Sequence, residues 1–416
     1  MNKYHFLKKN KLLNYILVFT FCILIIGYFN FDKFSKKNVQ KIQNQDISTI
    51  STSNYTISTD LINLNFFKRY GSLDFVNNEL IYVDPNGIIY KFLNNDQLKI
   101  ISNERLNTNL DLFKLSVDPS EVFIDGFAVK DSMYLENIQT IFVSTIFYKP
   151  KEDCYVLSIF SKKLFKQGYN FISEDWDKIF ETSPCLKIFT TDPPFAVASS
   201  GGRLASLSDE EILLSVGDFY HYEGGKFTDL SSNLSNDYGK ILKININDKS
   251  KEVYSYGHRN PQGLALKDNI IFSTEHGPEG GDELNLIIND GFYGYPLYSE
   301  GTYYGERKWV KKSSENPSQI NPFMSWTPAI GISNLIFLNN VQFPLWENNL
   351  LITSLRGKSL FRLKYNKDRV YYIEKIFVGY RIRDIVQNNL NGNIYLLTDP
   401  QGADEKTHII KIQIEK

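Results

Sequence analysis

The chain has 416 residues, with 46 basic and 47 acidic side chains, so its net charge at pH 7 is close to zero. This balance excludes the strongly basic surface that is typical of nucleic-acid-binding proteins. Aromatic residues make up 14% of the chain, which favours strands over helices, and the length is sufficient for one large β domain or two ordinary domains.

A mostly apolar stretch without charge runs from Leu12 to Phe31, and four lysines precede it. Its length is sufficient to cross a bilayer as a helix. Large residues stand at its end, where a cleavable signal peptide needs small ones. We therefore predict that residues 1–31 form a cytoplasmic flank and one uncleaved transmembrane helix. Residues 32–60 are rich in polar side chains and are predicted to form a flexible linker.

Six short apolar runs, each followed by a polar loop, recur between residue 61 and the C-terminus. They are Leu80–Asp84, Ile141–Thr145, Ile212–Asp218, Ile270–Glu275, Leu350–Ser354 and Ile394–Asp399. Such a repeat is typical of propeller blades of roughly 40–50 residues that loop insertions have lengthened. A set of β-sandwiches would not explain six similar runs. We predict an all-β fold, a six-bladed β-propeller over residues 61–416.

If each run is the same strand of its blade, the loops that follow the runs open on one face of the disc. These loops carry Asp84, Gly217, Asp218, Glu275, His276, Arg356 and Asp399. The pattern therefore predicts a ligand site at the central mouth of the propeller, because rigid strands commonly position functional loops.

Cys22 lies in the apolar stretch, whereas Cys154 and Cys185 lie in the propeller region. Two cysteines of an exported domain can form a disulfide. The alternative is a pair of unrelated buried thiols, and the sequence leaves both open.

Polar residues, glycines and prolines crowd on both sides of the run that begins at Ile270. Residues 256–264 read Tyr-Gly-His-Arg-Asn-Pro-Gln-Gly-Leu, and residues 275–284 read Glu-His-Gly-Pro-Glu-Gly-Gly-Asp-Glu-Leu. Glycines and prolines alone would indicate only turns. A guanidinium, two amides, a carboxylate and a histidine around one strand end indicate a binding site instead.

Gly257–Leu264 and Glu275–Leu286 resemble the signature of the glucose/sorbosone dehydrogenase family, the soluble quinoprotein sugar dehydrogenases that use pyrroloquinoline quinone (PQQ) and calcium. The resemblance covers roughly residues 65–412. It implies a six-bladed propeller whose mouth binds the quinone.

The resemblance also implies which side chains contact the quinone. They are Arg259, Asn260, Gln262, Trp326, Arg356, Arg381 and Arg383. Arg381 and Arg383 project to the same side of a strand, where like charges cost energy unless an anion lies between them. The alternatives are a polar turn around Arg259 and a solvated basic strand edge at the two later arginines.

The resemblance also implies calcium at the backbone carbonyls of Gly277 and Pro278, and calcium is a hard cation that accepts oxygen ligands. Asp282 and Glu283 follow, and each could serve the metal or hold the loop. Glu283 is the ligand we predict.

The segment Phe195–Leu204 departs from the family's pattern. Active members carry a histidine shortly before a Gly-Arg-Leu element, and this histidine is the general base. Ser199 stands at that place here. A serine cannot accept a proton near neutral pH as an imidazole can. The remaining candidate bases are His276 and His221, and Arg259 is the third residue predicted at the catalytic centre.

The leading hypothesis is a membrane-anchored PQQ- and calcium-dependent dehydrogenase that oxidises a sugar or another alcohol. Such quinoproteins work outside the cytoplasm, so we expect a periplasmic or extracellular propeller, and a Cys154–Cys185 disulfide would agree. The sequence does not indicate the electron acceptor. The alternative is a non-catalytic, calcium-stabilised propeller that binds a carbohydrate or a protein partner, because fold alone does not fix function.

Overall fold

The computed structural model describes residues 39–41 and 47–415, except for 65–67, 94–96, 119–121, 168–169, 189–194, 196, 221, 224–225, 228–229, 303–317 and 402–405. The apolar stretch Leu12–Phe31 lies outside this part of the chain, so the predicted transmembrane helix stays a prediction. Among the described residues, no helix has both the length and the apolar character that a membrane crossing requires.

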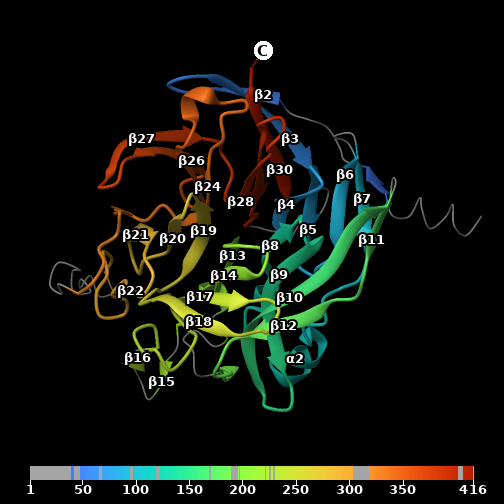
Figure 1. The fold of residues 1–416 in the computed structure, drawn as a ribbon, viewed down its shortest axis with the longest axis vertical. Helices are drawn as coiled ribbons and strands as arrows, with labels where there is room; N and C mark the ends of the chain where they lie inside the picture. Colours follow the sequence, from blue (N-terminus) through green and yellow to red (C-terminus); the bar gives the residue numbers. More distant parts are fainter. Residues whose placement is uncertain are drawn as a thin grey trace, which may run out of the picture.

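Six sheets of four or five strands surround a central axis, as Figure 1 shows. Blade 1 contains β4 (Ser72–Val76), β5 (Glu79–Val83), β6 (Ile89–Leu93) and β7 (Gln97–Ser102), with β1 (Val39–Lys41) at its edge. Blade 2 contains β8 (Val129–Leu135), β9 (Thr140–Lys149), β10 (Cys154–Gln167), β11 (Asn170–Ser173) and β12 (Asp177–Glu181). Blade 3 contains β13 (Gly201–Ser206), β14 (Glu211–Val216), β17 (Lys240–Asn245), β18 (Lys251–Tyr256) and β22 (Gly291–Phe292).

Blade 4 contains β19 (Pro261–Lys267), β20 (Ile270–Glu275), β21 (Asp282–Ile287) and β23 (Met324–Trp326). Blade 5 contains β24 (Ile332–Phe337), β25 (Leu350–Ser354), β26 (Ser359–Tyr365) and β27 (Val370–Phe377). Blade 6 contains β28 (Ile382–Gln387), β29 (Ile394–Thr398), β30 (His408–Ile414), β3 (Thr56–Asn63) and β2 (Ile47–Ser51). Outside the blades lie the helix α2 (Leu110–Ser116), the hairpin of β15 (Tyr222–Glu223) and β16 (Lys226–Phe227), and the short 3-10 turns Ile124–Gly126, Val197–Ser199 and Pro344–Trp346.

The prediction of a six-bladed propeller is confirmed. Each of the six apolar runs coincides with the second strand of a blade, namely β5, β9, β14, β20, β25 and β29. These strands are buried on both faces, which explains why they read as continuous apolar runs.

The ring closes through strands from the two ends of the chain. The early strand β3 pairs antiparallel with β30, from Ile57 opposite Ile414 to Asn63 opposite His408. The linker prediction therefore needs correction for residues 47–60, which form β2 and most of β3. Their Ser and Thr residues made the segment look polar, but Thr and Ile also suit strands, and Ile57 is fully buried.

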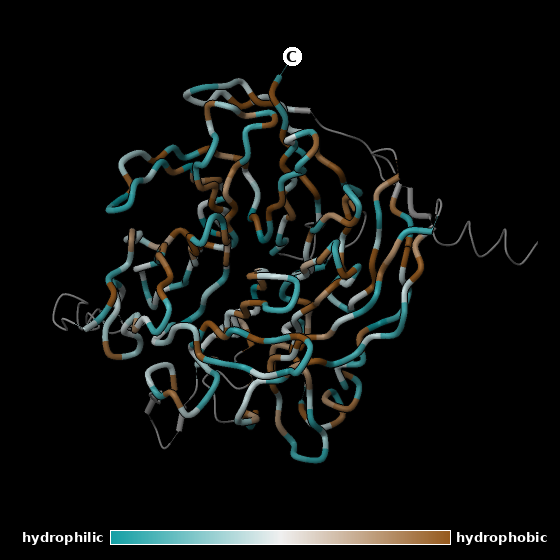
Figure 2. The backbone as a smooth tube through the Cα atoms, in the orientation of Figure 1, coloured by the Kyte–Doolittle hydropathy of each residue, from teal (hydrophilic) through white to brown (hydrophobic). Residues whose placement is uncertain are grey.

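Each neighbouring pair of blades shares one hydrophobic core among the described residues. Figure 2 shows hydrophobic residues along the strands, while loop tips on the outside are largely hydrophilic. A disulfide joins Cys154, at the start of β10, to Cys185, which follows β12, with the two Cα atoms 5.7 Å apart. Of the two alternatives that the sequence leaves open, the structure supports the disulfide.

A buried ionic network links all six inner strands at the axis. The Arg203 guanidinium of β13 donates to Asp131 of β8 at 3.0 Å and to Asp384 of β28 at 2.8 Å. Its Nε donates to the Gln262 carbonyl of β19 at 2.6 Å. Asp384 also accepts hydrogen bonds from Ser72 Oγ of β4 at 3.1 Å and from Asn334 Nδ2 of β24 at 2.6 Å. Arg203 therefore fixes the relative positions of the six blades.

Replacing Arg203 with leucine should destabilise the protein by about 3–5 kcal/mol, because two buried carboxylates lose their cationic partner. Urea unfolding followed by circular dichroism measures the change. Arg369→Leu, at an exposed position, is the matched control and should change the free energy of unfolding by less than about 0.5 kcal/mol. Equal stability of the two variants would show that the network does not hold the ring together.

Candidate active site

The direction of the strands determines which loops lie on the same face of the propeller. In an antiparallel blade the inner strand begins where the second strand ends, and Pro261 of β19 therefore lies opposite Glu275 of β20. Residues that lead into inner strands and residues that follow second strands meet on one face. The predicted convergence of these loops is visible in Asp399, after β29, which binds Arg69 ahead of β4 and Arg383 in β28.

Glu275 organises the loop that precedes β19. Its carboxylate accepts hydrogen bonds from the backbone N–H groups of Arg259 and Asn260. The other oxygen lies 3.0 Å from His258 Nδ1, and His258 Nε2 lies 2.8 Å from Ser255 Oγ. The His258 ring also stacks on Tyr293. His258 is fully buried and has a structural role, which is to hold Glu275 in place.

The three residues predicted from the first motif lie together. The buried Arg259 donates through NH1 to the His276 carbonyl at 2.9 Å, and its guanidinium lies over the Tyr220 ring. Asn260 Oδ1 accepts from Gln262 Nε2 at 2.9 Å. Gln262 Oε1 in turn accepts from Arg383 NH1 at 3.2 Å, so the motif in blade 4 is connected to blade 6.

Three arginines surround one buried carboxylate at the mouth. Asp399 Oδ2 lies 2.7 Å from Arg383, 3.4 Å from Arg69 and 3.5 Å from Arg381. Burial alone would raise the pKa of Asp399, but the arginines hold this pKa below its usual value. The Tyr70 ring lies beneath Arg69 and Arg383, with the Lys130 ammonium 4.4 Å from its centroid.

The cluster carries more positive charge than Asp399 can balance. The buried Nε atoms of Arg69, Arg381 and Arg383 have no hydrogen-bond partner in the part of the chain that the structure describes. Burial, and then repulsion from Arg383 and Arg69, lower the pKa of Lys130 to about 7. Buried donors of this kind are stabilised when an anion accepts their hydrogen bonds. An anionic ligand with several oxygen atoms therefore fits the mouth.

Sequence reasoning identified Arg381 and Arg383 but missed Arg69, Tyr70 and Lys130. The position of Arg69 and Tyr70 in the chain could have identified them. They come just before the inner strand of blade 1, as Arg259 and Asn260 come just before the inner strand of blade 4.

The position of the missing histidine packs against the loop that follows β14. Ser199 is buried, and its carbonyl accepts from the Phe219 N–H at 3.1 Å. Asn260 Nδ2 holds the neighbouring Ala198 carbonyl. Gly217 permits this contact, because a Cβ there would lie 1.9 Å from the Ser199 carbonyl oxygen. The loop that carries Asp218 is thus packed directly against Ser199.

Asp218 is a buried titratable group that the sequence analysis placed in a mouth loop but did not select as a candidate base. It is 6% exposed, and its backbone N–H donates to the Arg259 carbonyl. Burial raises the pKa of Asp218 to about 7, against the opposing effects of Arg259 and of a hydrogen bond from Tyr295. The sequence feature that could have identified Asp218 is its position just after β14, the second strand of blade 3.

A small void lies next to the second motif. It measures about 10 Å³, the size of one water or ion, and Glu275, Gly277 and Glu283 are among its lining residues. Burial, and then the neighbouring Glu275, raise the pKa of Glu283 well above its usual value. Pro278 does not line this void. The described residues contain no group of three or more His, Cys, Asp or Glu side chains arranged for a metal.

The other predicted residues are dispersed. His276 lies at the void with Nδ1 3.7 Å from Asp282, and burial lowers its pKa. Trp326 is buried in the core between blades 4 and 5, beside Phe361. Arg356 is exposed in the loop after β25. His221 lies outside the described residues.

Comparison with known proteins agrees with this geometry. The sequence model of the Glucose / Sorbosone dehydrogenase family matches residues 180–410. The chain is 30% identical over 250 residues to aldose sugar dehydrogenase YliI of Escherichia coli K12, covering 57% of this chain and 66% of that one. It is 25% identical over 293 residues to quinoprotein glucose dehydrogenase B of Acinetobacter calcoaceticus, covering 51% and 61%.

A solved structure of similar fold is the apo-form of the soluble aldose sugar dehydrogenase from E. coli. Its TM-score is 0.66 at 20% identity, covering 86% of this chain and 100% of that chain. This likeness extends the shared propeller fold across most of the chain. The matched part spans only 57% to 66% of the length of the curated relatives.

Replacing Glu275 with glutamine should destabilise the protein by about 1–3 kcal/mol, because the amide nitrogen cannot accept the hydrogen bonds that one carboxylate oxygen receives. Urea unfolding measures this loss. Glu210→Gln, at an exposed position, is the matched control. If both variants unfold at the same urea concentration, Glu275 does not organise the site.

Proposed function

The chain belongs to the Glucose / Sorbosone dehydrogenase family, and from this premise we propose that it is a PQQ-dependent dehydrogenase that oxidises a hydroxyl group of a sugar. The observation that carries this proposal is the cluster of Arg69, Arg381 and Arg383 around Asp399, with three buried Nε donors that lack partners among the described residues.

The residues present fit the quinone. PQQ carries carboxylates, and Arg69, Arg381 and Arg383 are the donors that would bind them. Asn260 and Gln262 are hydrogen-bonded to each other, and Gln262 accepts a hydrogen bond from Arg383, so these amides lie next to the arginine cluster. When bound, PQQ supplies the two-electron acceptor for the oxidation.

Calcium belongs to the same proposal. Glu275, Gly277 and Glu283 line a void of about 10 Å³, and their carboxylate and carbonyl oxygens are the groups that would hold the cation. Hard carboxylate and carbonyl oxygens are the ligands that calcium prefers. A cation there would also offset the repulsion between the buried carboxylates of Glu275 and Glu283. This repulsion supports the assignment of calcium to the void.

We assign the proton-accepting role to Asp218 in place of His276 or His221. Its carboxylate accepts the proton of the substrate hydroxyl as the carbon–oxygen double bond forms. Arg259 and Tyr295 lie against Asp218 and help to keep a fraction of it ionised. A pKa of about 7 suits a general base that works near neutral pH. Ser199, which is held through its backbone, takes no proton.

A location outside the cytoplasm and anchoring by residues 12–31 are further parts of the proposal. The Cys154–Cys185 disulfide supports the location, because disulfides persist in oxidising compartments, whereas the anchoring rests on the apolar sequence of residues 12–31.

The test is dye reduction by the purified full chain, loaded with PQQ and calcium, over a panel of aldoses. Asp218→Asn should lower kcat about 10²–10³-fold, because general base catalysis contributes at this level. The matched control is Asp368→Asn, at an exposed position. In the wild type, kcat should rise with pH through about 7, because only the ionised carboxylate accepts a proton.

A wild type that binds PQQ but reduces no dye with any sugar would contradict the proposal and favour a non-catalytic binding propeller. Unchanged kcat in Asp218→Asn would exclude Asp218 as the base. Restored turnover in Ser199→His, from an inactive wild type, would identify a chain that has lost its base.

A further inference from the structure

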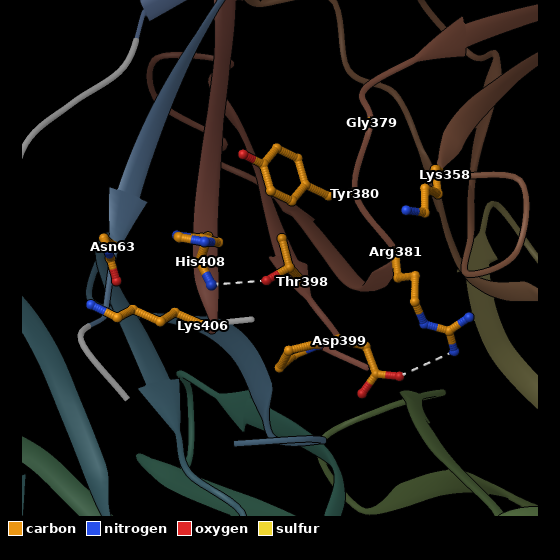
Figure 3. A pocket seen from close by; sticks show the side chains of 10 residues that line it. Asn63, Lys358, Gly379, Tyr380, Arg381, Thr398, Asp399, Lys406 and His408 are labelled. Carbon is orange, nitrogen blue, oxygen red and sulfur yellow. Dashed lines mark hydrogen bonds and ion pairs between the residues drawn. The ribbon is translucent and has the colours of Figure 1, made fainter. Parts of the chain in front are cut away.

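A pocket lies on the functional face, between blades 5 and 6. It has a volume of about 370 Å³, and its lining includes Asn63, Lys358, Tyr380, Arg381, Lys406 and His408. Figure 3 shows Lys358, from the turn between β25 and β26, and Tyr380, from the connection between β27 and β28, at this pocket, while Arg381 turns toward Asp399. We call this pocket the lateral pocket.

The lateral pocket carries positive charge that the described residues do not neutralise. The ammonium groups of Lys358 and Lys406 form no ion pair or hydrogen bond with any described residue. Asp399 is the one carboxylate among the residues that line the pocket, and Arg383 already binds it at 2.7 Å. Lys358 and Lys406 are both exposed, so their ammonium groups are accessible to a ligand that enters the pocket. An anion there would gain Coulombic attraction from both lysines and from Arg381.

Neutral groups complete the lining. Tyr380 is 38% exposed, and its ring meets the His408 ring edge-on, with centroids 5.5 Å apart. Thr398 Oγ accepts the His408 backbone N–H at 2.8 Å, which fixes the floor of the pocket. An exposed aromatic face beside hydroxyl and amide groups suits a small polar molecule.

The lateral pocket overlaps only in part with the residues assigned to the quinone. Its lining shares Arg381 and Asp399 with the arginine cluster, but it includes neither Arg383 nor Gln262. None of the residues around the small void at Glu275 lines it. Lys358 and Lys406 therefore add cationic charge beyond the groups assigned to the quinone.

We propose that the lateral pocket binds a phosphate or carboxylate group carried by the substrate, so that the preferred substrates are acidic sugars. This inference rests on the proposed sugar-oxidising function for the identity of the ligand. The charge chemistry is shared by sugar phosphates and sugar acids, and binding measurements with each separate them.

The test is isothermal titration calorimetry on the full chain without PQQ, using glucose 6-phosphate, glucuronate and glucose as probes. At least one acidic sugar should bind about tenfold more tightly than glucose. Lys406→Gln and Lys358→Gln should each reduce this preference several-fold, and raising the salt concentration should reduce it further. Lys375→Gln, at an exposed position in β27, is the matched control and should leave the preference unchanged.

Equal affinity for the acidic and neutral sugars would overturn the inference. It would also be overturned if Lys406→Gln or Lys358→Gln weakened PQQ binding and left the sugar preference intact, because the pocket would then belong to the quinone. The calorimetry needs no turnover, so failure of the dehydrogenase proposal and failure of this inference give different results.

Discussion

The buried charge of Arg203 at the propeller axis is the constraint on which the site depends. Its guanidinium binds Asp131 and Asp384 and donates to the carbonyls of Gln262 and Arg383. The two residues whose backbones it holds present their side chains to each other at the mouth. The interaction that fixes the six inner strands therefore also aligns the polar residues of blades 4 and 6, which are far apart in the sequence.

The mouth of the propeller contains three arginines, Arg69, Arg381 and Arg383, that share the single carboxylate of Asp399. Burying several guanidinium groups beside a single carboxylate costs free energy unless a further anion binds. The arginine cluster therefore favours an anionic ligand, and for this reason it is the basis of the functional proposal. Burial also determines the chemistry of Asp218, in the loop that packs against Ser199. It raises the pKa of Asp218 to about 7, which is a useful value for proton transfer near neutral pH.

The sequence predicted the fold well because the second strand of each blade is buried on both faces and forms a continuous apolar run. It also predicted residues that lie close together in the sequence, such as Arg259 and Gln262 in one motif, or Arg381 and Arg383 at the start of β28. Arg69, Lys130 and Asp218 were not selected, because each comes from a different blade and joins the others only through the closed ring. The pairing of β3 with β30 was missed for a similar reason, since its partner lies at the other end of the chain.

Equilibrium titration of PQQ into the full chain, in the presence of calcium and followed by absorbance, tests the central claim most directly. The account predicts saturable binding of one PQQ per chain. It also predicts affinity at least about tenfold weaker in Arg383→Gln, which loses a charge-assisted hydrogen bond, but unchanged in Arg369→Gln. No saturable binding, or equal affinity in the two variants, would contradict the assignment of the mouth as a quinone site.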